Sequence, residues 1–188
     1  MAEVKWHALL GEDVRLEPLH QRHAPALFAL VDRNRSHLDA WLPWVESHRS
    51  LENTRSLIEA GEMQQALDNG CLWGLFVEPD DELAGVVDLQ WVQWQHRAAS
   101  LGYWLGAQFQ GHGYMTRALR LLEAFVFDEL ELNRLELSVA CENMRSLALA
   151  ERVGFVREGR RRQYECLHGA FVDHYSLAIL ALDYRLPA

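Results

Sequence analysis

Two spacings of apolar residues divide the chain into predicted helices and strands. Apolar side chains that recur three and four residues apart predict amphipathic helices, whereas alternation or short apolar runs between turn residues predict strands. The predicted helices are residues 20–35, 52–67, 111–130 and 143–153. The predicted strands are residues 14–19, 71–78, 83–93, 98–105, 134–140, 155–167 and 171–181.

The order of these elements is β-α-α-β-β-β-α-β-α-β-β, which predicts an α/β fold with a mixed sheet, in one domain over residues 1–188. Turn residues at 79–82 and 96–97 join three strands into an antiparallel meander. The strand–helix–strand unit over residues 101–140 predicts a parallel crossover. Residues 168–169 predict a hairpin turn, and helix 52–67 has Leu57, Ile58 and Met63 as its apolar positions.

Composition narrows the class of protein. The formal net charge of −9 argues against a nucleic-acid binder, because phosphate contacts need a positive surface, and it suits a cationic partner such as an amine or a basic peptide. Cys71, Cys141 and Cys166 form no CxxC pair, which favours neither a disulfide framework nor a zinc site and indicates a reducing compartment such as the cytoplasm. We expect no signal peptide and no membrane span, since no apolar run approaches ~18 residues.

A glycine-containing loop is the most informative motif. Gly111 and Gly113 lie between a predicted strand and a strongly amphipathic helix. Glycine permits a tight turn, and the N–H groups of the first helical turn form an anion site together with the helix dipole. The loop lacks the lysine of a P-loop, and Thr116 stands where a dinucleotide-binding loop has its third glycine. The two common nucleotide loops therefore fit poorly.

This loop resembles that of the GCN5-related N-acetyltransferase (GNAT) superfamily, since Gln108-x-x-Gly111-x-Gly113 matches the pyrophosphate motif Q/R-x-x-G-x-G/A. Further stretches resemble the branch that acetylates the N-termini of ribosomal proteins. They are Leu42-Pro43-Trp44, Ala84-Gly85-Val86-Val87, Gly102-Tyr103-Trp104-Leu105, Leu132-Asn133-Arg134-Leu135-Glu136-Leu137, Asn143-x-x-Ser146, Val153-Gly154-Phe155 with Glu158-Gly159, and Gly169-x-Phe171-x-Asp173. The resemblance covers nearly the whole chain and implies a mainly antiparallel sheet flanked by helices.

The resemblance implies acetyl-CoA as co-substrate and no metal. Backbone N–H groups of residues 109–114 would hold the pyrophosphate. The strands that end at Leu105 and begin at Arg134 would splay apart, so that pantetheine lies between them. Main-chain groups near Trp104 and Leu105 would bind its amides and polarise the thioester carbonyl. The implied cofactor-binding residues are Trp104, Leu105, Gln108, Phe109, Gln110, Gly111, His112, Gly113, Tyr114, Met115, Thr116, Asn143 and Ser146.

Asn143 and Ser146 have a structural reading beside the functional one, because Asn143 is a good helix N-cap. In related enzymes the asparagine also contacts the pantetheine arm, and the serine lies near the sulfur as a general acid. Transfer to an amine also calls for a general base, since an α-amino group with a pKa near ~8 is mostly protonated at neutral pH.

The base is where this chain departs from the pattern. The closest branch has a glutamate at the position of Gln93, which cannot accept a proton. Asp88, His96 and Glu142 are substitutes, and Asp88 is preferred because an acid within an apolar strand suggests a cleft. Alternatively no base is present, or catalysis has been lost.

Other candidates have weaker support. Trp41 and Trp44 either roof the acceptor pocket or pack the helix pair onto the sheet, and Gln93 is the third predicted substrate contact. We interpret His20 and His23 as surface residues. Cys141 is read as a packing residue, and residues 160–162 as a solvated basic run at a strand edge or loop.

Three functions remain open on the sequence. The first is acetylation of a protein or peptide N-terminus. The second is acetylation of a small amine such as a polyamine, an amino acid or an antibiotic, and the third is a non-catalytic acetyl-CoA-binding module. A homodimer is compatible with each of them. An amine-bearing peptide or small molecule is the expected partner, and neither nucleic acid nor membrane is.

Overall fold

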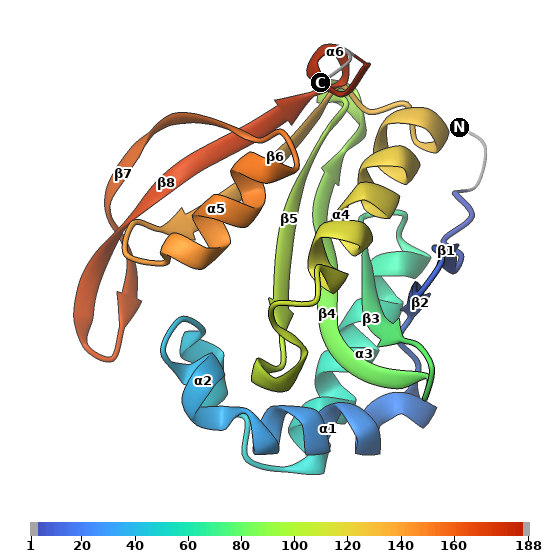
Figure 1. Ribbon diagram of the computed structural model, residues 1–188, viewed down its shortest axis with the longest axis vertical. Helices are drawn as coiled ribbons and strands as arrows, with labels where there is room; N and C mark the ends of the chain where they lie inside the picture. The colour runs from blue at the N-terminus through green and yellow to red at the C-terminus, as the bar shows by residue number, and fades with distance from the viewer. Residues whose placement is uncertain (1–3, 186–188) are drawn as a thin grey trace.

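The computed structural model describes residues 4–185 and contains one eight-stranded sheet with the strand order β1-β2-β3-β4-β5-β6-β8-β7 (Figure 1). The strands are β1 (Leu9–Leu10), β2 (Val14–Pro18), β3 (Cys71–Val77), β4 (Glu82–Gln93), β5 (Ala98–Leu105), β6 (Arg134–Ala140), β7 (Val156–Leu167) and β8 (Ala170–Leu180). The helices are α1 (Ala24–Arg33), α2 (Arg35–Asp39), α3 (Leu51–Ala66), α4 (Tyr114–Ala124), α5 (Met144–Arg152) and α6 (Ala181–Arg185). This mixed α/β arrangement confirms the predicted fold class.

The sheet is antiparallel except where β5 pairs with β6 across the α4 crossover. The parallel pairing covers only Ala98–Leu101 opposite Arg134–Leu137. Beyond it, β5 continues to Leu105 and β6 to Ala140 without a ladder between them. The two strands therefore diverge, as the resemblance implied.

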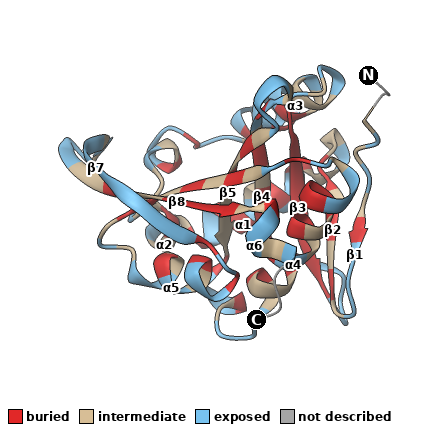
Figure 2. Ribbon diagram, turned by 90° about the horizontal axis from the view of Figure 1, so that it is seen from above, coloured by how far each residue is buried: buried red, intermediate tan, exposed pale blue. Residues whose placement is uncertain are grey.

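Helices cover the two faces of the sheet in different ways. Because successive strand residues point to opposite faces, the contact of one strand residue with a helix identifies the face that this helix covers. Leu72 packs beneath Gly61 of α3, and its ladder partner Asp88 points to the same side, which we call the α3 face. Tyr103 points the other way and reaches Ser146 of α5, so that side is the α5 face. Figure 2 shows α3 on one side of the sheet and α4 and α5 on the other.

The β7–β8 hairpin forms the far edge of the sheet and turns at residues 168–169, as predicted. The basic run 160–162 lies exposed on β7, which confirms a solvated strand edge. At the hairpin tip, His168 Nε2 lies 2.8 Å from the carbonyl oxygen of Asp39 in α2. The tip of the hairpin thus contacts α2.

Three elements were not predicted, namely β1, α2 and α6, and each has only two to five residues. So few residues carry no periodicity that a pattern can detect. Predicted helix 111–130 begins only at Tyr114 and ends in a π-helical turn at Phe125–Glu129. The apolar positions assigned to helix 52–67 were partly wrong. Ile58 is buried, but Leu57 and Met63 are exposed because the small residues Thr54 and Gly61 complete the packed face.

Candidate active site

A cavity of about 1180 Å³ opens between the diverging strands β5 and β6 and is flanked by α4 and α5. We call it the first cavity. It exceeds the ~300–1,000 Å³ of common small-molecule pockets, so it suits an extended ligand. Its lining includes Trp104, Leu105, Phe109, Gln110, Gly111, Gly113, Tyr114, Met115, Thr116, Asn143 and Ser146. All the predicted cofactor-binding residues except Gln108 and His112 therefore meet around it.

The two exceptions have physical reasons. Gln108 points into solvent from the 3₁₀ turn Ala107–Phe109. The ring of His112 stacks on that of Tyr114, with ring centroids 5.4 Å apart, and so turns away from the lining. Neither side chain lines the first cavity, and their contact with the cofactor stays a prediction.

The backbone of the glycine loop requires glycine at two positions. Gly111 and Gly113 have φ angles of 83° and 76°, in the left-handed region that other residues enter at a cost. A Cβ at Gly111 would meet no atom within 4 Å, so the loop surface there is open. A Cβ at Gly113 would lie 2.8 Å from a guanidinium nitrogen of Arg117. The loop thus exposes bare backbone to the cavity.

The amides available to an anion differ from those expected. The N–H groups of Phe109 and Gln110 donate to the carbonyls of Gly106 and Ala107, at 3.0 and 3.2 Å. They are therefore not free to hold a phosphate. The amides that begin α4, from Tyr114 to Thr116, have no carbonyl one turn before them. Within the predicted range 109–114, the amides of Phe109 and Gln110 are therefore set aside, and a phosphate site at the later amides stays a prediction.

Asn34, a buried residue that the sequence did not single out, fixes the start of this loop. Its Oδ1 accepts the N–H of Ala107 at 2.8 Å, and its Nδ2 donates to the carbonyl of Leu30 at 2.9 Å. The carboxyl end of α1 is thereby tied to the turn that precedes the glycines.

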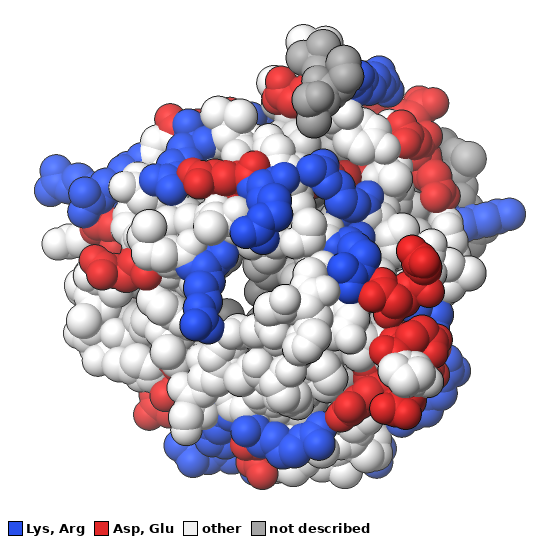
Figure 3. Space-filling view, in the orientation of Figure 1, with Lys and Arg blue, Asp and Glu red and all other residues white. Residues whose placement is uncertain are grey.

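Basic side chains gather at the mouth of the first cavity. Arg145 and Arg152 line it from α5, and Arg145 donates to Oε1 of Gln110 at 2.7 Å. Arg120 of α4 donates to the carbonyls of Arg152 and Val153, which joins the two helices. Figure 3 shows Lys and Arg side chains around a hollow near the centre of this face. The motif Asn143-x-x-Ser146 contains Arg145, so spacing from that motif was the signal that could have found it.

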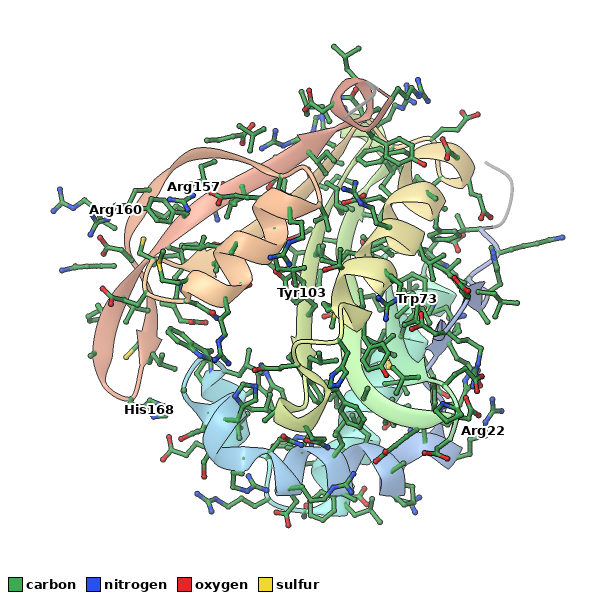
Figure 4. All side chains as sticks on the ribbon, viewed as in Figure 1. Arg22, Trp73, Tyr103, Arg157, Arg160 and His168 are labelled. Atoms are coloured by element: carbon green, nitrogen blue, oxygen red, sulfur yellow. The ribbon has the colours of Figure 1, made fainter. Side chains whose placement is uncertain are left out.

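Ser146 has a hydrogen-bonded partner across the first cavity. Its Oγ lies 2.9 Å from the hydroxyl of Tyr103, which is also 3.2 Å from the Ser146 carbonyl oxygen. Burial raises the pKa of Tyr103 to about 12, so this phenol stays protonated at neutral pH. Figure 4 labels Tyr103, on β5 beside α5. Asn143 caps α5 by accepting the Ser146 N–H at 3.2 Å, which confirms its structural role.

Asp88 lies on the α3 face, half-buried, and opposite Gly102 in the β4–β5 ladder. Burial raises its pKa to about 6, while Gln90 Nε2 donates to its Oδ2 at 2.5 Å and opposes that rise. Gly102 lines the first cavity, but Asp88 itself lines neither this cavity nor the smaller one described next. Gln90 covers the carboxyl group by its hydrogen bond, and the role of Asp88 as the base stays a prediction. Of the other two base candidates, Glu142 lines the first cavity and His96 lines neither.

A second cavity of about 180 Å³ lies on the α3 face and shares Leu137 and Ser138 with the first. Most of its remaining lining is polar. It consists of Trp91, Gln93, Ala98, Ala99, Ser100, Glu136, Arg161, Tyr164 and Ser176. The sequence predicted only Gln93 among these residues.

The predicted acceptor contacts divide between the two cavities. Trp41 lines the first cavity and Gln93 the second. Trp44 lines neither, since its ring packs 5.3 Å from His48 and 6.3 Å from Trp104, centroid to centroid. The packing interpretation therefore holds for Trp44. His23 is less exposed than predicted, because it packs against Phe76 and Glu17.

Within residues 4–185 no group of three or more His, Cys, Asp or Glu side chains is arranged to hold a metal ion. In the same range, every helix is too short or too polar to cross a bilayer.

Comparison with known proteins agrees with this geometry. Residues 13–156 match the family described as "Acetyltransferase (GNAT) domain". YdaF of Bacillus subtilis, whose name proposes a ribosomal N-acetyltransferase, is 34% identical over 171 residues, which cover 89% of this chain and 92% of YdaF. The ribosomal-protein-serine acetyltransferase of Escherichia coli is 29% identical, over 87% of this chain and 90% of that enzyme.

Among solved structures, RimL, a ribosomal L7/L12 α-N-protein acetyltransferase solved in complex with coenzyme A, superposes with a TM-score of 0.89 at 27% identity. The match covers 93% of this chain and 98% of RimL. The splayed strands, the glycine loop and these relatives lead to one conclusion: the chain belongs to the GNAT family of N-acetyltransferases.

Proposed function

We propose that this enzyme transfers the acetyl group of acetyl-CoA directly to the N-terminal amine of a protein, of the kind that ribosomal proteins present. One observation carries the proposal. The first cavity runs from the residues that begin α4 to the point where β5 and β6 diverge. An extended ligand with phosphates at one end and a reactive thioester at the other matches that layout.

The chain supplies a fitting donor set for coenzyme A, which would provide the activated acetyl group. The amides of Tyr114, Met115 and Thr116 meet the pyrophosphate, and the positive end of α4 favours its charge. Arg145 and Arg152 add cationic donors at the mouth. The unpaired edges of β5 and β6 offer main-chain groups to the pantetheine amides. A β5 N–H near Trp104 polarises the acetyl carbonyl.

Proton transfer is divided between two walls of the site. Asp88 accepts a proton from the acceptor ammonium through water, by way of the space beside Gly102 that the amide of Gln90 now fills. Ser146 returns a proton to the departing sulfur. Tyr103, hydrogen-bonded to Ser146 and itself protonated, keeps that hydroxyl in place.

The acceptor is inferred from the relatives and from the second cavity. YdaF, the E. coli enzyme and RimL carry names that refer to ribosomal proteins. A polar cavity beyond the reacting centre gives room for residues that follow the amine, which a small amine would leave empty. Cytoplasmic location and a homodimer stay predictions.

The test is a calorimetric titration with acetyl-CoA followed by release of free thiol with a panel of acceptors. The panel holds N-terminal peptides of ribosomal proteins, the same peptides with a blocked amine, spermidine and free amino acids. We expect saturable binding and fastest turnover with the unblocked peptides. Faster turnover with spermidine or an amino acid would assign a small-molecule acceptor, and absence of binding would reject the proposal.

A further inference from the structure

Three polar side chains outside the predicted site form a chain on the α3 face. Ser138 Oγ of β6 lies 3.2 Å from Nδ1 of His174 on β8. On the far side of the imidazole, Nε2 lies 3.3 Å from Oε2 of Glu165 on β7. His174 is only 7% exposed. Such a set resembles in its order the hydroxyl–imidazole–carboxylate arrangements that move protons in other enzymes.

The direction of the first hydrogen bond follows from the chemistry of its partners. A carboxylate only accepts hydrogen bonds, so the imidazole hydrogen belongs on Nε2, which faces Glu165. Nδ1 is then an acceptor, and the Ser138 hydroxyl donates to it. Nε2 and Oε2 are close but not aligned, and Nε2 has no hydrogen-bond partner within residues 4–185. The negative charge of Glu165 thus favours the neutral tautomer with its hydrogen on Nε2, and it also stabilises the imidazolium.

Ser138 stands at the junction of the two cavities, since it lines both. It follows the last residue pair of the β5–β6 ladder, Leu101 and Leu137, where the strands begin to diverge. Its oxygen lone pairs, left free by the bond to His174, are exposed to whatever occupies that junction. An acceptor amine that reaches the gap from the α3 face meets this oxygen.

The chain of contacts depends on an irregular strand. Along β7 the ladder advances four residues, from Arg161 to Glu165, while β8 advances two, from His174 to Val172. Gln163 within this bulge has a φ of 51°, and its N–H donates to Asp173 Oδ1 at 2.8 Å. A bulge re-aims the side chains that follow it. Here it brings Glu165 to the imidazole and Tyr164 to within 4.9 Å of it, ring to ring.

Amide formation from an ammonium removes two protons from nitrogen. One must go before the amine can attack, and the other goes once the C–N bond forms. Asp88 accounts for one of them in the proposed function. We propose that Ser138, His174 and Glu165 form a relay that takes the other, which makes Ser138 and His174 catalytic residues and Glu165 a positioning residue. This inference rests on the proposed acetyl transfer.

The step balances as follows. As the nitrogen bonds to the acetyl carbon, its proton passes to Ser138 Oγ while the hydroxyl proton of Ser138 moves to Nδ1 of His174. The C–S bond then breaks, and the sulfur takes a proton from Ser146. The imidazolium faces Glu165 until it loses its proton to solvent. Asp88 releases the proton that it accepted to solvent, and Ser146 regains one from solvent. One proton thus ends on the thiol and one in solvent for each acetyl group transferred.

The charges around His174 favour this task. Burial lowers the pKa of the imidazole, Glu165 opposes that change, and Arg161 on the same strand as Glu165 adds to it. From β6 the facing group is the uncharged Ser138, and Tyr164 covers the ring from β7. The imidazole is consequently neutral at pH 7 and free to accept a proton. At acid pH it becomes charged and the relay stops.

Kinetics of Ser138→Ala and His174→Asn test the relay. Asparagine keeps an oxygen near the position of Nδ1 for the Ser138 hydroxyl but cannot take up a proton. We expect each variant to lower kcat by roughly 10²-fold with coenzyme affinity unchanged, and the double variant to lose no more than either one alone. If His174→Asn kept the kcat of the wild type, the role of His174 would be structural and the relay would be overturned. The same would follow if the kcat losses of the two single variants multiplied in the double variant.

His48 and Thr54 supply a matched control. They form a second buried imidazole–hydroxyl pair, 2.8 Å apart, and line neither cavity. His48→Gln and Thr54→Val should lower the melting temperature without a specific loss of kcat. A comparable kcat loss in these controls would also count against the relay.

A titration by NMR gives a readout that does not require turnover. In the enzyme alone, Glu165→Gln should lower the pKa of His174 by about one unit, since it removes the charge that stabilises the imidazolium. An unchanged pKa would refute the contact on which the relay depends. If the wild-type enzyme bound acetyl-CoA but acetylated no amine, the proposed function would be rejected. The titration would still show whether Glu165 stabilises the imidazolium of His174.

Discussion

The α5 face and the α3 face approach the diverging strands from opposite sides and are built in different ways. On the α5 face, two short segments supply most of the first cavity: the stretch from Trp104 to Thr116 and the first turns of α5. On the α3 face, five strands contribute between one and three residues each to the second cavity. The lining of the first cavity comes largely from a local sequence motif, whereas the lining of the second depends on how the strands are aligned in the sheet.

The two faces also differ in charge. Free amides and arginines line the α5 face, which suits the phosphates of a nucleotide. Asp88, Glu136 and Glu165 lie on or beside the α3 face, which suits an ammonium group and the protons it gives up. A net acidic enzyme can therefore bind a polyanion, because the local field at the cavity and not the total charge determines which ligand binds.

Replacement of Asp88 by Asn tests the α3 face with the largest expected effect. Loss of a general base should lower kcat/KM by about 10²–10⁴-fold while coenzyme affinity stays the same. In the wild-type enzyme kcat/KM should rise as pH increases through about 6, where Asp88 ionises, and the variant should lose this contribution and keep only the acid limb of His174. A pH–rate profile of both proteins measures it.

The same variant has an opposite effect on stability. Because folding raises the pKa of Asp88, the native state favours the protonated form, and the charge disfavours folding at neutral pH. Asp88→Asn should therefore raise the melting temperature at pH 7 but leave it nearly unchanged at pH 4. A drop at pH 7 would show that Asp88 is held by structural contacts rather than by a role with protons.

Replacement of Gly113 by Val tests the α5 face. A left-handed backbone costs a β-branched residue about 1–2 kcal/mol, and the new side chain would also keep a phosphate away from the amides. We expect acetyl-CoA to bind about 100-fold more weakly, since each 1.4 kcal/mol is about tenfold. Calorimetry measures the change.

Gly169 offers a matched control. Its φ of 78° nearly equals that of Gly113, and a Cβ there would meet no atom within 4 Å. Gly169→Val should carry a similar backbone cost at the hairpin turn, without the close contact to Arg117, and leave coenzyme affinity intact. Equal affinity losses in both variants would place the phosphates elsewhere.

The contrast between the faces explains what the sequence could predict. Gly111 and Gly113 were found because a local backbone conformation demands glycine, and that demand is written in adjacent residues. The order of the long strands and helices followed from periodicity for the same reason. Asp88 was chosen from local chemistry, an acid in an apolar strand, yet its shielding by Gln90 could not be seen.

Ser138, His174 and Glu165 escaped the sequence because three strands must align to bring them together. Their contact depends on the β6–β8 and β8–β7 registers and on a bulge at a residue, Gln163, that is not the glycine or asparagine expected there. A shift of one residue in either register would send a side chain to the opposite face. Phe109 and Gln110 show the converse, since a 3₁₀ turn within the motif itself occupied amides assigned to the phosphate.

Ser146→Ala tests the proton donor at the place where the two faces meet. A thiolate leaves readily, so the loss of its proton donor should lower kcat by about tenfold to 10²-fold, with little change in coenzyme binding. Tyr103→Phe should give a smaller loss of the same kind, because it only removes the partner of the Ser146 hydroxyl. Parallel losses in kcat and in binding would instead assign Ser146 to capping or ligand contact.

Replacement of Asn34 should have the smallest effect on activity. It tests whether a change in the glycine loop alters coenzyme affinity without altering kcat. Asn34→Leu removes the hydrogen bond to the partly buried N–H of Ala107, which should cost about 1 kcal/mol of stability. Because Asn34 ties α1 to the glycine loop, coenzyme affinity should fall a few-fold as well, while kcat at saturating acetyl-CoA stays near that of the wild type. Chemical denaturation and calorimetry would measure the two changes. A fall in kcat as large as the fall in affinity would mean that the loop also sets the geometry of the reacting centre, and the division into two independently built faces would be wrong.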